Sequence, residues 1–184
     1  MFDLWYRFFN PKDKEEEQDR REGPVLLVGN PNVGKSLIFN YLTGSYVTVS
    51  NYPGTTVEIS RGEMEAGLEV IDTPGIYSLR PVTEEERVTR MLLFQSRPLL
   101  LVNVIEALKL ERTLPLILEL METGLSLLLV LNMMDEAEAG GITFQSSLLE
   151  RELGVRVIEA VSTRGLGLNR IRRYIIGCSG RGGR

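Results

Sequence analysis

One short stretch of the chain contains the residue types and the spacing that bind phosphate. Residues 29–36 read GNPNVGKS, which satisfies the pattern G-x-x-x-x-G-K-[S/T] at every required position. In such a phosphate loop the glycines let backbone N–H groups turn inward around an anion, and the following helix N-terminus adds partial positive charge. The Lys35 ammonium would reach the terminal phosphates of a nucleotide, and the Ser36 hydroxyl would take one position on Mg²⁺. The stretch therefore predicts a polyphosphate site.

A second stretch, Asp72-Thr73-Pro74-Gly75, supplies what such a site needs at its triphosphate end. Asp72 can hold Mg²⁺ through a bound water, and the backbone N–H of Gly75 can donate to a γ-phosphate oxygen. Alone the tetrapeptide would be an ordinary turn after a strand. Because it follows the phosphate loop by 36 residues and directly follows an apolar run, it indicates the magnesium and γ-phosphate side of the site.

Two later stretches indicate which base is bound. In Asn132-Met133-Met134-Asp135 the Asp135 carboxylate can accept hydrogen bonds from N1–H and the exocyclic amine of guanine, whereas adenine offers no matching donor pair. The thioether of Met133 can cover a face of the base. Backbone N–H groups of Ser162-Thr163-Arg164-Gly165 would contact the base oxygen. These stretches predict a guanine nucleotide, GTP or GDP.

Residues 45–56 are rich in Ser, Thr, Asn, Gly and Pro and have no sustained periodicity, so we expect a mobile loop. One of its threonines could close over the nucleotide and bind Mg²⁺. We favour Thr56 over Thr55 because Thr56 adjoins the strand that follows. A loop that grips the γ-phosphate side through one side chain is a two-state element, ordered with triphosphate and released after hydrolysis.

The elements that would position these residues alternate between strands and helices. Strands are predicted at 25–28, 57–63, 68–71, 99–104, 126–131 and 155–161, with a tight connection at 65–67 that makes an antiparallel hairpin. Helices are predicted at 37–42, 83–94, 114–122, 144–153 and 168–176, with Thr113 and Thr143 as N-caps and Gly44 and Gly154 as ends. The order predicts an α/β fold, the P-loop GTPase (G domain) fold, with a mostly parallel six-stranded sheet, one antiparallel strand and helices on both faces.

Composition narrows the function classes. The chain has 184 residues, enough for one well-buried domain, and its formal charge of −4 gives no electrostatic argument for binding nucleic acid. It has no histidine and a single cysteine, Cys178, which rules out an internal disulfide and the usual zinc and His-based triad chemistries. The longest apolar runs fall far short of the roughly 20 residues that cross a bilayer, and a cytoplasmic setting fits best.

Three regions are expected along the chain. Residues 1–23 combine an aromatic segment with a charged linker, residues 24–177 would form the G domain, and residues 178–184 would be a flexible Gly/Arg tail. The aromatic segment could dock on its own domain, bind a partner or a membrane surface, or be a gene-boundary remnant. The sequence alone does not choose among these three.

With these residues assembled, the chain resembles the cytosolic G domain of the ferrous-iron transporter B (FeoB) family over residues 25–176. The resemblance is carried by residues 29–44, 51–58, 72–79, 132–135 and 161–165. It implies a GTPase switch that regulates ferrous-iron uptake at the inner face of the cell membrane, joined to a membrane iron-permease domain in the same or a neighbouring polypeptide. In the family an asparagine at the position of Asn32 helps bind K⁺ beside the phosphates, so the resemblance also implies a K⁺-stimulated rate.

The sequence departs from the family pattern in three places. Glu106 stands where the family usually has Asp in its Asn-Val-x-Asp-Ala stretch, and the N-terminal aromatic extension is not typical. The helical domain and the permease that normally follow are not in this chain, so we do not expect it to move iron by itself. The oligomeric state is left open.

The predicted reaction is in-line attack of water on the γ-phosphate of GTP, with Lys35, Asn32, Thr56 and Gly75 as the catalytic set. Ile76 follows Gly75 where many small GTPases place a water-orienting Gln, so slow intrinsic hydrolysis is expected. Mg²⁺ ligands would be Ser36, Thr56 and, through water, Asp72, and a K⁺ ligand would be Asn32. Nucleotide contacts are predicted for Gly29, Asn30, Pro31, Asn32, Val33, Gly34, Lys35, Ser36, Leu37, Thr55, Thr56, Asp72, Gly75, Asn132, Met133, Asp135, Ser162, Thr163 and Arg164.

Two other functions stay open at this point. The first is a GTPase of the ribosome- or tRNA-modification type, which RNA binding that weakens with salt would favour. The second is a nucleotide-sensing module with little turnover, which a single-turnover rate no faster than that of free GTP would favour.

Overall fold

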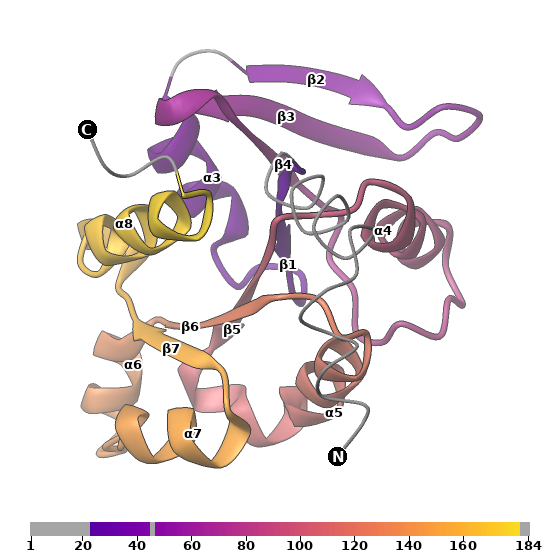
Figure 1. Ribbon diagram of the computed structural model, residues 1–184. Coiled ribbons are helices and arrows are strands. Elements are labelled where there is room, and N and C mark those ends of the chain that lie inside the picture. The colour runs from indigo at the N-terminus through magenta and orange to yellow at the C-terminus, as the bar shows by residue number, and fades with distance from the viewer. Residues whose placement is uncertain (1–22, 45–46, 181–184) are drawn as a thin grey trace, which may run out of the picture.

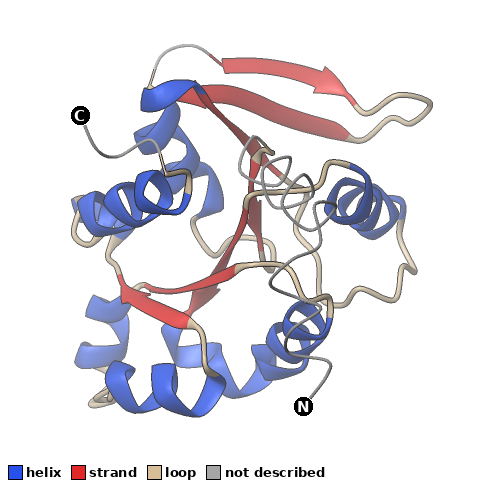
Figure 2. Cartoon of the chain, in the orientation of Figure 1, coloured by secondary structure: helices blue, strands red, loops and turns tan. Residues whose placement is uncertain are grey.

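The computed structural model describes residues 23–44 and 47–180. Within them, seven strands form one sheet in the order β2-β3-β4-β1-β5-β6-β7 (Figures 1 and 2). The strands are β1 (Val25–Val28), β2 (Val47–Asn51), β3 (Glu58–Met64), β4 (Leu68–Asp72), β5 (Leu100–Glu106), β6 (Leu127–Asn132) and β7 (Arg156–Glu159). The helices are α3 (Lys35–Thr43), α4 (Glu84–Gln95), α5 (Leu110–Glu122), α6 (Met134–Ala139), α7 (Ser146–Leu153) and α8 (Leu168–Cys178). Short 3₁₀ turns lie at η1 (Glu65–Gly67), η2 (Ala107–Lys109) and η3 (Ser162–Arg164).

The sheet is built around β1, whose four residues are completely buried. β1 pairs in parallel with β4 on one side and with β5 on the other, and β6 and β7 continue the parallel part. β1 is a continuous apolar run, and β5 and β6 are almost entirely apolar apart from Asn103, Glu106 and Asn132, because both faces of these strands are covered. This arrangement places the phosphate loop at the carboxyl end of a central strand, where open α/β sheets bind their ligands.

Helices cover both faces of the sheet, as expected. α3 and α8 pack over one face, through side chains such as Phe39 and Ile171. α4 and α5 pack over the other face, and α6 and α7 cover its β5-β6-β7 end (Figure 1). The α/β architecture with a mostly parallel sheet is therefore confirmed.

The predicted number of strands, six, was wrong. The sheet has a seventh strand, β2, inside the segment predicted to be a mobile loop. Val47–Asn51 pairs antiparallel with β3, in register from Val47 opposite Gly62 to Asn51 opposite Glu58. All five residues of β2 are exposed, so the strand has no buried face to produce an alternating pattern. Pairing with a neighbouring strand, and not periodicity, makes it a strand.

Two helix starts also differ from the prediction. α5 begins at Leu110, and Thr113 is not its N-cap but lies buried inside the helix, where its hydroxyl donates to the carbonyl oxygens of Lys109 and Leu110 at 3.0 Å each. Pro115 is therefore inside the helix, and packing of the buried face compensates for the hydrogen bond that proline cannot donate. α7 begins at Ser146, three residues beyond Thr143.

The last helix ends close to the predicted end of the domain. α8 continues through Cys178, and Ser179 is buried. The division of the chain into three regions stays a prediction. The expected aromatic segment and linker up to residue 22, and the tail from residue 181, lie outside the described residues. No helix in the described part of the chain has the length and hydropathy needed to cross a membrane.

Candidate nucleotide-binding site

The phosphate loop holds Lys35 in a buried position beneath it. The Lys35 side chain is 7% exposed, and its Nζ donates to the carbonyl oxygens of Gly29 at 3.2 Å and Asn30 at 2.9 Å. An ammonium group has three donors, so these two bonds fix its direction and leave one donor for a phosphate oxygen. Burial lowers the pKa of Lys35, and the nearby Asp72 carboxylate opposes that change.

Gly34 has no room for a side chain. Its φ is +92°, and a Cβ there would lie 2.4 Å from Nδ2 of Asn132 and 3.0 Å from Oγ of Ser162. The phosphate loop is therefore in direct contact with the two loops predicted to bind the base. Sequence order separates these three loops widely, and the parallel sheet brings them to one edge.

Ser36 and Asp72 meet on the side of the loop where the triphosphate is predicted to lie. The Ser36 hydroxyl donates to Oδ2 of Asp72 at 2.7 Å. The other carboxylate oxygen, Oδ1, is buried and has no hydrogen-bond partner among the described residues. Burial raises the pKa of the Asp72 carboxyl, and the bond from Ser36 opposes this rise. A hydroxyl beside a carboxylate with a free buried acceptor fits a hydrated Mg²⁺, because a metal-bound water can donate to that acceptor.

Gly75 lies directly against the phosphate loop. A Cβ at this position would be 2.7 Å from the backbone nitrogen and from Cγ of Pro31. The next residue, Ile76, is fully buried and its N–H donates to the carbonyl oxygen of Gly29 at 3.0 Å. The segment after Asp72 is therefore attached to the loop on which the γ-phosphate is predicted to lie.

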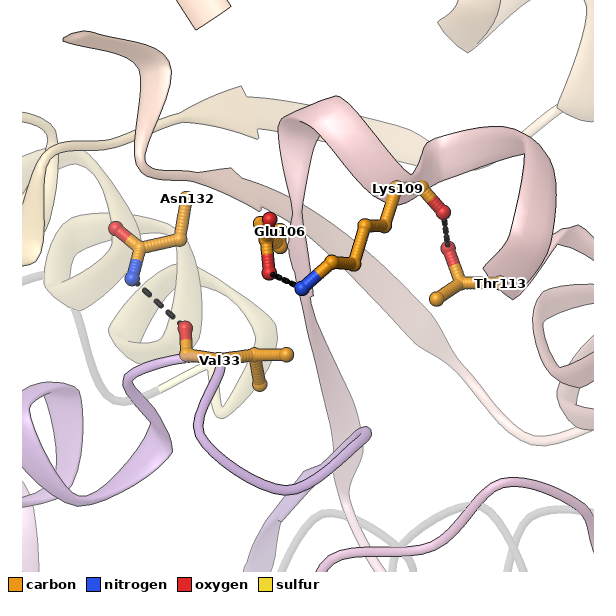
Figure 3. Close-up of polar contacts among 5 residues, drawn as sticks. All are labelled: Val33, Glu106, Lys109, Thr113 and Asn132. Carbon is orange, nitrogen blue, oxygen red and sulfur yellow. Dashed lines mark hydrogen bonds and ion pairs between the residues drawn. The ribbon is translucent and has the colours of Figure 1, made fainter. Parts of the chain in front are cut away.

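Asn132 connects the loops on the side of the site where the base is predicted to bind. Its fully buried amide donates through Nδ2 to the Val33 carbonyl oxygen (Figure 3) and to Oγ of Ser162, each at 2.9 Å, and its Oδ1 accepts from the Ser162 N–H at 2.9 Å. These bonds use both amide donors. In this structure Asn132 therefore positions the two neighbouring loops, while a direct contact with the base stays a prediction.

The residues predicted to face the base lie where β6 and β7 end. Met133 has a left-handed backbone conformation, φ +61° and ψ +38°, which turns the chain into α6. Asp135 in the first turn of that helix is partly exposed, and its Oδ1 accepts from the Glu136 N–H at 3.2 Å. Thr163 and Arg164 are exposed on η3.

Thr56 does not contact the Ser36–Asp72 pair in this structure. Thr56 is exposed, and its hydroxyl lies 3.5 Å from Oε2 of Glu84 at the start of α4. The Thr55 hydroxyl donates to the Tyr52 carbonyl oxygen at 2.9 Å. Figure 1 shows this turn at the far end of the β2-β3 hairpin, apart from the loop that follows β1. The Mg²⁺ role of Thr56 stays a prediction that requires the turn to move.

The remaining predicted contacts lie on the outer side of the loop. Asn32 is exposed with φ +64°, and Leu37 on α3 is 46% exposed. A small cavity of about 70 Å³ lies against the phosphate loop, and two of its lining residues, Lys109 and Glu106, form an ion pair at 2.6 Å (Figure 3). Lys109 belongs to no motif. The only sequence signal for this region is Glu106, which stands where the family usually has Asp. Other lining residues are Asn30, Pro31, Val33, Tyr77, Arg112 and Thr113.

Comparisons with known proteins find similar sequences over most of the chain. The family model described as "Ferrous iron transport protein B" matches residues 24–175. An Fe(2+) transport protein A/Fe(2+) transporter FeoB fusion protein of Porphyromonas gingivalis is 44% identical over 148 residues, which make up 78% of this chain and 18% of that protein. Fe(2+) transporter FeoB of Escherichia coli is 39% identical over 158 residues, 82% of this chain and 20% of that protein.

Solved structures are similar as well. A crystal structure of an S. thermophilus NFeoB mutant bound to GDP has a TM-score of 0.79 and 34% identity, over 88% of this chain and 65% of that one. The FeoB G-domain from Methanococcus jannaschii has a TM-score of 0.72 and 36% identity, over 86% of this chain and 97% of that one. The chain spans about a fifth of the length of the curated relatives it matches.

Proposed function

Because the chain belongs to the ferrous iron transport protein B family, we propose that it is a domain that binds guanine nucleotides and slowly hydrolyses GTP to GDP and phosphate. The observation that carries the proposal is the Ser36–Asp72 contact beside the buried ammonium of Lys35. Two residues 36 positions apart meet where a triphosphate and its metal ion would lie. A similar domain solved with bound GDP supports the same ligand class.

In the proposed reaction a water molecule attacks the γ-phosphate in line, and the protein contributes position and charge. Lys35 and the inward-facing amides of the phosphate loop balance the charge on the phosphates. Ser36 and Asp72 would hold Mg²⁺, which screens the charge on the β- and γ-phosphate oxygens. The Gly75 N–H would donate to the γ-phosphate, and Thr56 would complete the site after its loop closes.

The rate is expected to be low because no polar side chain follows Gly75. Ile76 is completely buried in the core between the sheet and α4 and cannot orient a water molecule. We propose that K⁺ beside Asn32, or a partner, supplies the missing contribution. The same buried isoleucine favours the alternative of a nucleotide sensor with little turnover.

Base selection is assigned to Asp135. Its carboxylate lies just past the carboxyl end of β6, in the first turn of α6, where the base would extend from the phosphate loop. Two acceptor oxygens match the paired donors of guanine and not those of adenine. Backbone N–H groups of Ser162, Thr163 and Arg164 would face the base oxygen.

The proposed physiological role is regulation of ferrous-iron transport. The relatives are named as Fe(2+) transporters, and this chain matches only about a fifth of their length. We therefore propose a membrane iron-permease domain, in the same or a neighbouring polypeptide, as the partner. The domain would then work on the cytoplasmic side of the membrane.

Calorimetry tests the proposal directly. The purified chain is titrated with GDP and with ADP in the presence of Mg²⁺, and hydrolysis of GTP is followed under single-turnover conditions. The proposal expects GDP to bind and ADP to bind far more weakly, with a hydrolysis rate above that of free GTP. Equal affinity for the two diphosphates would refute it. Tight binding with no rate above free GTP would favour the sensor.

A further inference from the structure

The segment that follows Gly75, residues 76–83 (the switch segment), is held by side chains from two helices. It contains no helix or strand, so its backbone groups depend on side chains for hydrogen bonds. Those side chains come from α4 and α5, on the sheet face opposite α3. The contacts therefore connect two helices to the residue predicted to sense the γ-phosphate.

Glu119 on α5 makes the closest of these contacts. Its Oε2 accepts from the Leu79 N–H at 2.6 Å, and the Ser78 hydroxyl lies 3.1 Å from both carboxylate oxygens. The Ser78 oxygen in turn accepts from the Arg80 N–H at 3.0 Å. The carboxylate thus holds Ser78 and Leu79 directly, and Arg80 through the Ser78 hydroxyl. Hydrogen bonds to a charged group are among the stronger ones in proteins.

Two side chains on α4 hold the rest of the switch segment. Glu86 is 7% exposed and accepts from the N–H groups of Tyr77 at 3.4 Å, Val82 at 2.9 Å and Thr83 at 3.2 Å. Arg90 donates to the carbonyl oxygen of Leu79 at 3.1 Å. Because Glu86 also completes the N-terminal capping box of α4, its contacts have a structural role of their own. Glu119 has no such second role in its helix.

In the conformation that Glu119 stabilises, Thr56 is bonded toward α4 and not to the Ser36–Asp72 pair. Gly75 lies against Pro31, the Ile76 N–H is bonded to Gly29, and Thr56 is turned toward Glu84. Gly75 lies three residues before Ser78, so binding of a γ-phosphate by Gly75 would shift the start of the switch segment. A contact that anchors Ser78 and Leu79 opposes such a shift.

We propose that Glu119 is a positioning residue that lowers the affinity for GTP relative to GDP by holding the switch segment where it lies in this structure, against the shift that binding of a γ-phosphate by Gly75 would require. The inference rests on the proposed function. It assigns a nucleotide-dependent role to a side chain on α5 that belongs to no nucleotide-binding motif. It also makes the position of α5 a determinant of which nucleotide the domain prefers.

The test compares GTP and GDP affinities of the whole chain with Mg²⁺ present, using a slowly hydrolysed GTP analogue and GDP in parallel titrations. Glu119→Ala is expected to raise the ratio of GTP-analogue affinity to GDP affinity about tenfold, the equivalent of one hydrogen bond to a charged group. Ser78→Ala leaves the Leu79 bond in place and should give a smaller rise in the same direction. Glu122→Ala, an exposed carboxylate three residues along the same helix, is the matched control and should leave the ratio unchanged.

An unchanged ratio in both Glu119→Ala and Ser78→Ala, with normal GDP binding, overturns the inference and leaves the proposed function intact. Failure of the wild-type chain to bind GDP overturns the proposed function, and the inference with it. A purely structural role for Glu119 would weaken both nucleotides equally, which also counts against the inference. If Glu119→Ala does not fold, Glu119→Gln and Ser78→Ala decide the question, because each keeps an acceptor or a donor of the cluster.

Discussion

The Ser36 hydroxyl donates to the Asp72 carboxylate at 2.7 Å, and the parallel pairing of β1 with β4 makes this contact possible. In that pairing Asp72 lies opposite Leu27, near the end of the strand that leads into the phosphate loop. Each residue ends up at the carboxyl edge of the sheet because the strands run in the same direction. This contact lies where we propose that Mg²⁺ binds.

Asp72→Asn should weaken the Mg²⁺ dependence of nucleotide binding. The variant keeps the shape of the side chain but loses the charge and one acceptor next to the metal ion, and changes of that kind cost about 10- to 100-fold in metal affinity. The measurement is GDP and GTP-analogue affinity as a function of Mg²⁺ concentration. Glu69→Gln, on the exposed side of the same strand, is the control. An unchanged Mg²⁺ midpoint in Asp72→Asn would remove Asp72 from the metal site.

Asp135→Asn should change the preferred base from guanine to xanthine. The amide that replaces the carboxylate can donate to the extra oxygen of xanthine but can no longer accept two hydrogen bonds from guanine. Loss of bonds to a charged group predicts about a 10- to 100-fold weaker affinity for GDP. Parallel titrations with GDP and xanthosine diphosphate test this, with Glu136→Gln as the neighbouring control. If xanthosine diphosphate gains nothing over GDP, another residue reads the base.

Replacing Na⁺ with K⁺ should increase the GTP hydrolysis rate, and Asn32→Ala should abolish that difference. The exposed left-handed position of Asn32 on the phosphate loop leaves its carboxamide oxygen accessible to a monovalent cation. The rates are measured under single-turnover conditions at constant ionic strength. Asn40→Ala, an exposed asparagine on α3, serves as control. Equal wild-type rates in the two salts would exclude this role for Asn32.

Asn132→Ala should destabilise the fold by about 2–4 kcal/mol, because it leaves buried groups of Val33 and Ser162 without their partner. The free energy of unfolding in urea measures the effect in the absence of nucleotide. Asn169→Ala, at an exposed position of α8, should change it little. A loss below about 0.5 kcal/mol would show that the hydrogen bonds of Asn132 do not hold the loops together.

Stability should fall in acid in part through Glu86. Hydrogen bonds from backbone N–H groups hold the pKa of Glu86 below its usual value of 4.5, and the bond from Val82 has the largest effect. A carboxyl whose pKa is lowered by folding contributes stability above its unfolded-state pKa and loses that contribution as the pH falls through the folded-state pKa. Urea unfolding at pH 7 and at successively lower pH down to 3.5 should show a smaller acid-induced loss in Glu86→Gln than in the wild type. Glu85→Gln, at the exposed preceding position, should behave like the wild type. The same dependence of stability on pH in all three proteins would contradict the assignment.

Several elements could be predicted because their signals are local. Thr83 and Glu86 form the capping box at the start of α4, within a residue of where the helix was expected. Gly154 ends α7 in a left-handed conformation, as its position after an amphipathic run indicated. The strand-loop-helix order around the phosphate loop could likewise be predicted from the motif and its spacing.

Other features could not be predicted because their partners are distant in sequence. β2 is a strand only because β3 lies beside it, and its exposed residues give no periodic signal. The contact between Glu119 and Ser78 joins a helix to a loop 41 residues earlier, and nothing in either segment marks it.

The sequence by itself determined the phosphate loop and the order of most strands and helices, and it supplied the residues predicted to bind magnesium and guanine, because spacing and side-chain chemistry are encoded within a few positions. The tertiary structure decided which of those residues contact one another. In the folded chain Ser36 contacts Asp72, Asn132 bonds two loops together, and Thr56 lies beside Glu84. The physical reason is that parallel pairing and helix packing set these distances, and both depend on the whole sheet.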